Sequence, residues 1–340
     1  MKLSRNLTIA FVLGAALAAG THGQQPGEGA VDAATRAKVI DLALAQLQKA
    51  YIFAETAEKM SAALRTRAAA KEYDGISDGR EFADRLTRDL QAVSQDKHLR
   101  IRYSPEGLPL HPEQPTAEER AQALADERRR NFGFERVERL EGNVGYIELR
   151  GFSGSPESRG AAVAAMKVVA DTDALIFDLR RNGGGSPFMI GLLCSYLFDD
   201  VVHLNDFYVR ETDSHQEFFT SRDVEGRRYG QSKPVFILTS TRTFSAAEEF
   251  TYDLKNLKRA TVVGETTGGG AHPGGLRRLT EHFGIWLPTG RAINPITKTN
   301  WEGTGIEPDI KTSALDALDS AQREALKTLR KSAALEGRQP

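Results

Sequence analysis

Short apolar runs alternate with helical segments through the C-terminal half of the chain, and this alternation limits the fold more than any other feature. The apolar runs have the length of buried strands, whereas the segments between them carry apolar residues at helical spacing. Strands that alternate with helices usually pair in parallel, because each helix carries the chain back across the sheet. We therefore expect an α/β domain with a mostly parallel sheet over residues 96–312. The expected strands cover residues 98–103, 144–149, 174–179, 235–239, 261–264, 285–287 and 291–293, and the expected helices cover 156–170, 187–198 and 245–257.

The segment before this domain is rich in alanine and almost free of proline and glycine. Its apolar residues recur at helical spacing, as Leu44 and Leu47 illustrate. Residues 31–95 are therefore predicted to form a small helical lobe. A charged helix over residues 117–130 should be exposed to solvent, and residues 313–340 should form a terminal helix followed by a tail.

The first residues have the pattern of an export signal. Two positive charges precede an apolar run over residues 7–19, which ends in small residues. The run is shorter than the about 20 residues that a membrane-spanning helix needs. We therefore predict a signal peptide over residues 1–23, cleaved after Gly20 or Gly23. The protein should be exported, periplasmic or extracellular and bacterial, and its mature chain should have no integral membrane segment.

Charge and cysteine content exclude several classes of function. The 340 residues include 45 basic and 46 acidic side chains, for a formal net charge of −1. Such a balance creates no long-range field that would attract nucleic acid. The single cysteine, Cys194, excludes an intrachain disulfide and a cysteine-based zinc site. Because it lies in an apolar run, we interpret Cys194 as a buried structural thiol.

A glycine-rich loop follows one of the expected strands. Residues 178–187 read Asp-Leu-Arg-Arg-Asn-Gly-Gly-Gly-Ser-Pro, and a helix is expected to begin at the proline. Three glycines let the backbone approach a ligand and direct amide hydrogens at an oxygen, with support from the helix dipole. A phosphate site is weakly supported, because no Gly-Lys-Ser/Thr ending or Gly-x-Gly-x-x-Gly spacing is present. A simple tight turn remains an alternative.

A second junction of strand and helix contains Ser245. Ser245 and Glu248 fit the Ser-x-x-Glu capping box, so a purely structural role is the usual interpretation of such a serine. The same geometry would also activate a nucleophile, because the helix start and the Ala246 amide could stabilise an oxyanion. Both junctions should meet at the carboxyl edge of the sheet, where ligands of open α/β sheets bind.

A nucleophilic serine needs a base, and two histidines qualify. His98 lies where the helical lobe meets the sheet, and His272 lies in a glycine-rich loop over residues 268–275 that could contact substrate. Residue chemistry alone leaves the choice between His98 and His272 open.

Four segments together resemble the tail-specific, or C-terminal processing, peptidase family. Within it the chain is similar to the branch that contains the interphotoreceptor retinoid-binding protein repeats and the tricorn protease core. The resemblance spans roughly residues 31–310. The segments are Asp-Lys-His-Leu at 96–99, Asp-Leu-Arg-Arg-Asn-Gly-Gly-Gly at 178–185, residues 243–272 from Thr-Phe-Ser-Ala-Ala-Glu-Glu onwards, and Asn-Trp-Glu-Gly-Thr-Gly-Ile-Glu-Pro-Asp at 300–309.

This resemblance implies a crotonase- or ClpP-like α/β core and a serine peptidase that needs no metal or organic cofactor. Its substrate would be a peptide or protein, cut through an acyl-serine intermediate. The implied roles are Ser245 as nucleophile, His98 as base, Glu302 as the carboxylate that supports the histidine, and the amides of Gly183, Gly184 and Ala246 as the oxyanion hole.

The sequence also departs from familiar members of that family. The glycine-rich region that follows Ser245 has no lysine, which argues against a Ser-Lys dyad, and Lys97 stands where tricorn-like members have a serine. About 45 residues between His98 and Val144 are too few for a PDZ domain. A carrier of apolar ligands on the same fold is the main alternative function, and a coenzyme A thioester enzyme is a weaker one.

Overall fold

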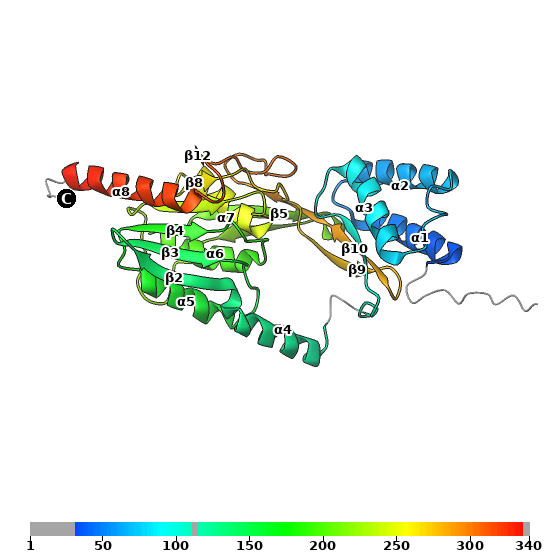
Figure 1. Ribbon diagram of the computed structural model, residues 1–340, viewed down its shortest axis with the longest axis horizontal. Helices are drawn as coiled ribbons and strands as arrows, with labels where there is room; N and C mark the ends of the chain where they lie inside the picture. The colour runs from blue at the N-terminus through cyan, green and yellow to red at the C-terminus, as the bar shows by residue number, and fades with distance from the viewer. Residues whose placement is uncertain (1–30, 111–114, 336–340) are drawn as a thin grey trace, which may run out of the picture.

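The computed structural model describes residues 31–110 and 115–335. The molecule is elongated, with three N-terminal helices at one end and a large sheet with its helices at the other (Figure 1). The predicted signal peptide and its cleavage site lie outside the described residues. Within the described part, no helix combines the length and the apolar character needed to cross a membrane.

A six-stranded sheet forms the centre of the larger part. Five strands run parallel, and the edge strand β2 pairs antiparallel with β3. The prediction of an α/β fold with a mostly parallel sheet is therefore confirmed. The strands, in spatial order, are β12 (Ile310–Lys311), β8 (Thr261–Gly264), β7 (Val235–Thr239), β4 (Ala174–Asp178), β3 (Val144–Leu149) and β2 (Phe134–Leu140).

Helices cover both faces of this sheet (Figure 1). Three of them bury one face together with the larger apolar cluster, and α8 packs on the opposite face through Ala317, Ala321 and Ala325, which are fully buried. Their spacing of four residues places these small side chains on one stripe, so the helix can approach the strands closely. The helices are α5 (Ser158–Val169), α6 (Pro187–Leu197), α7 (Ala246–Asn256) and α8 (Ala317–Leu335).

The N-terminal helices share a core with strands from distant parts of the chain. Leu99 and Ile101 of the chain after α3 belong to the same buried cluster, and so do Ile285 and Leu287. We therefore find no break in the packing at residue 95, where the sequence suggested one. The elements are α1 (Ala33–Ala50), α2 (Ala54–Ala69), α3 (Gly79–Ser94) and the sheet of β1 (Arg100–Tyr103), β10 (Phe283–Pro288) and β9 (Gly274–Arg278).

Two further parts complete the description. A third sheet has three strands, in the order β11 (Gly290–Ile293), β5 (His203–Val209) and β6 (Ser214–Phe219). Helix α4 (Ala117–Arg129) buries none of its residues, as its charged sequence predicted. It begins at a capping box in which Thr116 and Glu119 satisfy each other's backbone amides.

Candidate active site

Ser245 and the glycine-rich loop meet at the carboxyl edge of the sheet. Ser245 directly precedes α7, which follows β7, whereas the loop follows the neighbouring strand β4. A Cβ atom added to Gly184 would lie 2.7 Å from Ser245 Cβ and 3.0 Å from the Ala246 amide nitrogen. Only glycine fits here, because a Cβ atom would be too close to these atoms and because φ at Gly184 is +111°, which other residues rarely adopt. The two junctions that the sequence singled out are therefore in contact.

The backbone of Ser245 has an unusual conformation. Its φ and ψ are 55° and −124°, in a region that residues with a side chain rarely occupy and that costs on the order of 1–3 kcal/mol. The Ser245 amide donates a hydrogen bond of 3.0 Å to Glu248 Oε2, which helps to fix this turn. Such strain is typical of a serine held at a sharp turn between strand and helix for nucleophilic attack.

Glu248 connects the turn at Ser245 to the second glycine-rich loop. Its fully buried carboxylate also accepts hydrogen bonds from the Thr267 hydroxyl and from the amides of Gly269 and Gly270, at 2.5, 2.7 and 2.8 Å. Burial raises the pKa of Glu248, while these donors partly offset the increase. One side chain therefore positions both Ser245 and residues 268–270.

The three predicted oxyanion-hole amides differ in their surroundings. The Gly184 amide donates to Asn182 Oδ1 at 2.8 Å, so its hydrogen is already committed. The amides of Gly183 and Ala246 donate to no acceptor within residues 31–110 and 115–335. Gly183 is exposed and Ala246 lines the pocket beside Ser245. This geometry favours Gly183 and Ala246, and does not support Gly184, as oxyanion donors.

His98 lies beside Phe244, the residue that precedes Ser245. Its ring packs against the Phe244 ring with centroids 4.6 Å apart, and its backbone amide donates to Asp96 Oδ1 at 3.0 Å. His98 Nδ1 is buried and has no hydrogen-bond partner among the described residues. Burial lowers the pKa of His98 to about 4, so the ring is neutral at pH 7. No hydrogen bond joins His98 to Ser245 among the described contacts, and such bonds often tighten only when substrate binds.

Glu302 contacts the other candidate histidine. Its Oε2 lies 3.5 Å from His272 Nδ1, whereas Asp96 Oδ2 lies 2.9 Å from the same nitrogen. Glu302 also accepts a hydrogen bond of 2.5 Å from the Ala271 amide. Burial raises the pKa of Glu302 to about 7, and the nearby His272 partly opposes this. The carboxylate expected to support His98 is therefore placed against His272.

Asp96, His272 and Glu302 could together hold a divalent cation, because their ligand atoms all lie within 4.8 Å of one another. One imidazole nitrogen and two carboxylate oxygens are suitable ligands for zinc. Asp96 already contacts His272 Nδ1 and accepts a hydrogen bond from the Tyr51 hydroxyl, 3.1 Å from its Oδ2, whereas Glu302 Oε1 is buried without a partner among the described residues. These contacts join the second glycine-rich loop to Asp96.

An apolar pocket of about 250 Å³ opens beside Ser245. It lies between the start of α7, the start of α6, strands β5 and β6, and the second glycine-rich loop. Neither His98 nor His272 lines it. Its walls include Phe188, Phe218 and Trp301, and its lining also includes Glu249, one helical turn after Ser245.

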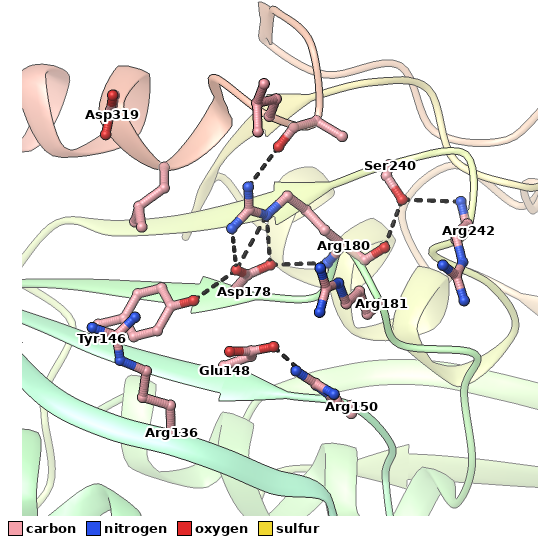
Figure 2. Close-up of a pocket in the computed structure, with 13 residues that line it drawn as sticks. Arg136, Tyr146, Glu148, Arg150, Asp178, Arg180, Arg181, Ser240, Arg242 and Asp319 are labelled. Carbon is pink, nitrogen blue, oxygen red and sulfur yellow. Dashed lines mark hydrogen bonds and ion pairs between the residues drawn. The ribbon is translucent and has the colours of Figure 1, made fainter.

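A second pocket, of about 540 Å³, lies on the α8 side of the sheet and is rich in arginine (Figure 2). Arg180 forms a bidentate contact with Asp178, and its Nη1 donates to the Ala314 carbonyl just before α8. Burial alone would raise the pKa of Asp178, but hydrogen bonds from Arg180 and Tyr146 lower it. Arg180 and Asp178 neutralise each other, and Arg180 also binds the Ala314 carbonyl. We interpret these contacts as a structural link between β4 and α8 and assign them no catalytic role.

Two residues important to the site received no role from the sequence. Glu248 was assigned only to a capping box, and Asp96 was noted only as part of a motif. The proximity of Asp96 to His98 in sequence was a usable signal, because a carboxylate two residues away can accept the histidine's own amide. Nothing in the sequence indicated that Glu248 would bind a loop about 20 residues further on.

Residues 143–312, half of the chain, match peptidase family S41, and residues 33–131 match the N-terminal domain found with that family in eukaryotic IRBP. The chain belongs to peptidase family S41. The second match also explains why the packing continues past residue 95. Membership makes the chain a relative of carboxyl-terminal-processing serine peptidases.

Two curated relatives illustrate the similarity. Carboxyl-terminal-processing peptidase 1, chloroplastic, of Arabidopsis thaliana is 29% identical over 190 residues, which cover 53% of this chain and 36% of that protein. The carboxy-terminal-processing protease of Bartonella bacilliformis is 26% identical over 182 residues, which cover 51% and 39%. The matches thus span less than two-fifths of the relatives' length.

Solved structures share the fold over most of the chain. A lipoprotein from Streptococcus agalactiae has a TM-score of 0.57 and 20% identity, and the match covers 86% of this chain and 96% of that one. The tricorn protease has a TM-score of 0.54 and 13% identity, with 87% and 37% covered. At these identities the likeness concerns the fold alone.

Proposed function

We propose that the protein is an exported serine peptidase that cleaves peptide bonds through an acyl-Ser245 intermediate. The observation that carries the proposal is the strained backbone of Ser245 in contact with Gly184 at the start of α7. A helix cap alone does not require this conformation, because serine normally caps a helix with extended backbone angles. Membership of family S41 supports the same chemistry.

In this proposal His98 accepts the hydroxyl proton as Ser245 Oγ attacks the carbonyl carbon of the peptide. The carbonyl oxygen becomes an oxyanion, which the amides of Gly183 and Ala246 and the start of α7 stabilise. Protonated His98 then donates its proton to the leaving amine, and an acyl-Ser245 ester remains. A water molecule that His98 deprotonates attacks this ester, releases a carboxylate product and restores Ser245.

Glu302 takes a supporting role in this mechanism. It accepts from the Ala271 amide and lies against His272, so it holds the loop that lies over Ser245 and His98. We therefore expect Glu302→Gln to reduce activity less than His98→Gln does.

The test is reaction with a fluorescent fluorophosphonate, which labels activated serines. Wild-type protein should be labelled at Ser245, and Ser245→Ala should lose labelling and peptide hydrolysis by at least about a thousandfold with an unchanged circular dichroism spectrum. The control is Ser214→Ala, at an exposed serine on β6. Full hydrolysis by Ser245→Ala would rule out the proposed nucleophile, and an unlabelled wild type that binds fatty acids would favour the carrier alternative.

Export rests on the charged and apolar pattern of residues 1–23. Fractionation of bacterial cells that express the tagged chain should recover it outside the cytoplasm and shortened at Gly20 or Gly23. A chain that begins at residue 24 should remain in the cytoplasm. Recovery of the full-length chain in the cytoplasm would contradict the proposal.

A further inference from the structure

The pocket beside Ser245 has aromatic walls, and one of them, Phe188, is largely exposed to solvent. Phe188 at the start of α6 is 72% exposed, yet its ring lies 5.8 Å from that of Phe218. Phe218 in turn packs edge-on against Phe207, with centroids 5.4 Å apart. Single exposed apolar residues are common, but here exposed Phe188 adjoins half-buried Phe218 and Phe207 in one pocket lining, which indicates a binding surface. We call this cavity, bounded by Phe188, Phe207, Phe218 and Trp301, the aromatic pocket.

The floor of the aromatic pocket is polar but carries no cation. Glu249 is 4% exposed, and its Oε1 lies 3.4 Å from Asn205 Nδ2. Asp253, one turn further along α7, is fully buried outside the pocket lining and accepts from Asn294 Nδ2 at 3.3 Å. Burial raises the pKa of both carboxyl groups far above their usual range. Of these groups only Glu249 lines the pocket, and because burial raises its pKa to about 8 it favours the uncharged form near pH 7.

The volume of the aromatic pocket limits which ligands or side chains it can hold. Pockets for drug-sized ligands have volumes of roughly 300–1,000 Å³, so a volume of about 250 Å³ is suited to one large side chain. A basic side chain would place an ammonium or guanidinium among aromatic rings, where desolvation is costly. An aromatic or branched apolar side chain would instead gain contact with every wall.

We propose that the aromatic pocket binds the side chain of the substrate residue that supplies the acyl group, and that it selects large apolar side chains such as phenylalanine and leucine. The pocket contains Ser245 and Ala246 in its lining, so an acyl group attached to Ser245 Oγ would direct its side chain into this cavity. The inference rests on the proposed function, because it assigns a subsite of the same catalytic serine.

Peptide phosphonates that differ in one side chain test the inference. Phenylalanine, leucine, alanine and lysine versions compete with the fluorescent fluorophosphonate for Ser245 in the full chain. The phenylalanine and leucine probes should react at least about tenfold faster than the alanine probe, as expected for several buried methylene equivalents. The lysine probe should react no faster than the alanine probe.

Two neighbouring phenylalanines supply a matched pair of variants. Phe218 faces the aromatic pocket, whereas Phe219, the next residue on β6, stacks on His203 outside it. Phe218→Ala should slow the phenylalanine probe by about tenfold and leave the alanine probe nearly unchanged, and Phe218→Leu should restore part of the rate. Phe219→Ala should alter neither rate.

The outcomes separate the inference from the function on which it rests. Labelling of Ser245 with equal rates for all four probes, or with the lysine probe fastest, would overturn the aromatic subsite and leave the peptidase proposal intact. Equal effects of Phe218→Ala and Phe219→Ala would also overturn it, because only one of them faces the cavity. Failure of the fluorophosphonate to label Ser245 at all would overturn both.

Discussion

His98 is the residue whose ionisation most directly tests the proposed mechanism. In the proposed mechanism its neutral form is the base, and burial lowers its pKa to about 4. The rate at which a fluorophosphonate labels Ser245 should therefore be constant above about pH 5 and fall to half near pH 4. His98→Gln should slow labelling by about a hundredfold or more, the usual effect of a general base. His215→Gln, at an exposed histidine on β6, is the control.

The same shift in pKa has a consequence for stability. The unfolded chain binds a proton at His98 below about pH 6.5, whereas the folded chain does so only below about 4. The folded state therefore loses stability as the pH falls from 6.5 to 4.

The pH dependence of labelling can also contradict the proposal. A half-maximal labelling rate near pH 6.5, typical of an unburied histidine, would contradict the role given to His98.

Individual site residues were predictable only where their role depends on the local sequence. Ser245, His98 and the glycines could be placed from short motifs, because strand, turn and helix signals surround them. The hydrogen bond from the Gly184 amide to Asn182 could not be predicted, since it depends on the rotamer of Asn182. The partner of Glu302 could not be predicted either, because Glu302 and His272 are distant in the sequence and meet only in the folded chain.

At the scale of the elements, the second glycine-rich loop packs closely against Phe244 and His98. A Cβ atom added to Gly270 would collide with the Phe244 ring and lie 2.7 Å from His98 Cε1. Gly270→Ala should therefore displace His98 and slow labelling of Ser245 at least about tenfold, in line with the cost of small misplacements in active sites. Measurement of the labelling rate and of the melting temperature will separate displacement from unfolding.

Gly275, in strand β9 just after this loop, provides the control. A Cβ atom there would have no neighbour within 4 Å. Gly275→Ala should leave labelling and melting temperature unchanged. Equal losses in the two variants would indicate that the loop acts through its general flexibility and not through contact with His98.

Helices and buried strands were predicted better than exposed strands. Strands β3, β4, β7 and β8 of the large sheet and helices α5 to α8 agree with the expected ranges within a few residues. The sequence missed the charged edge strand β2, the short parallel edge strand β12, the pair β5 and β6, and β9. Strands β2, β6 and β9 bury almost none of their residues, so their sequences lack the apolar run or alternation that identifies a buried strand.

At the scale of the whole molecule, the N-terminal core depends on strands that lie far along the chain. Phe283 of β10 packs against Phe82 of α3 and Tyr103 of β1, with ring centroids 5.8 and 5.0 Å apart. Phe283→Ala should lower the free energy of unfolding by about 3–5 kcal/mol, the usual cost of removing a buried aromatic ring. Urea denaturation followed by tryptophan fluorescence measures this change.

Ile296→Ala is the matched control, because Ile296 is 55% exposed and such surface changes usually alter stability by about 0.5 kcal/mol or less. A small effect of Phe283→Ala would mean that the N-terminal helices form a separate folding unit. That result would support the boundary at residue 95 that the sequence suggested.

The shared core also determines when the candidate site can assemble. His98 leaves the N-terminal helices and Ser245 follows a strand of the large sheet, yet the segment that completes the core around α3 comes after both. A chain synthesised from its N-terminus cannot close this core until β9 and β10 have emerged, because contacts between distant segments form late and slowly. The order of synthesis would then keep a nascent peptidase inactive until almost all of its own chain is folded and protected from cleavage.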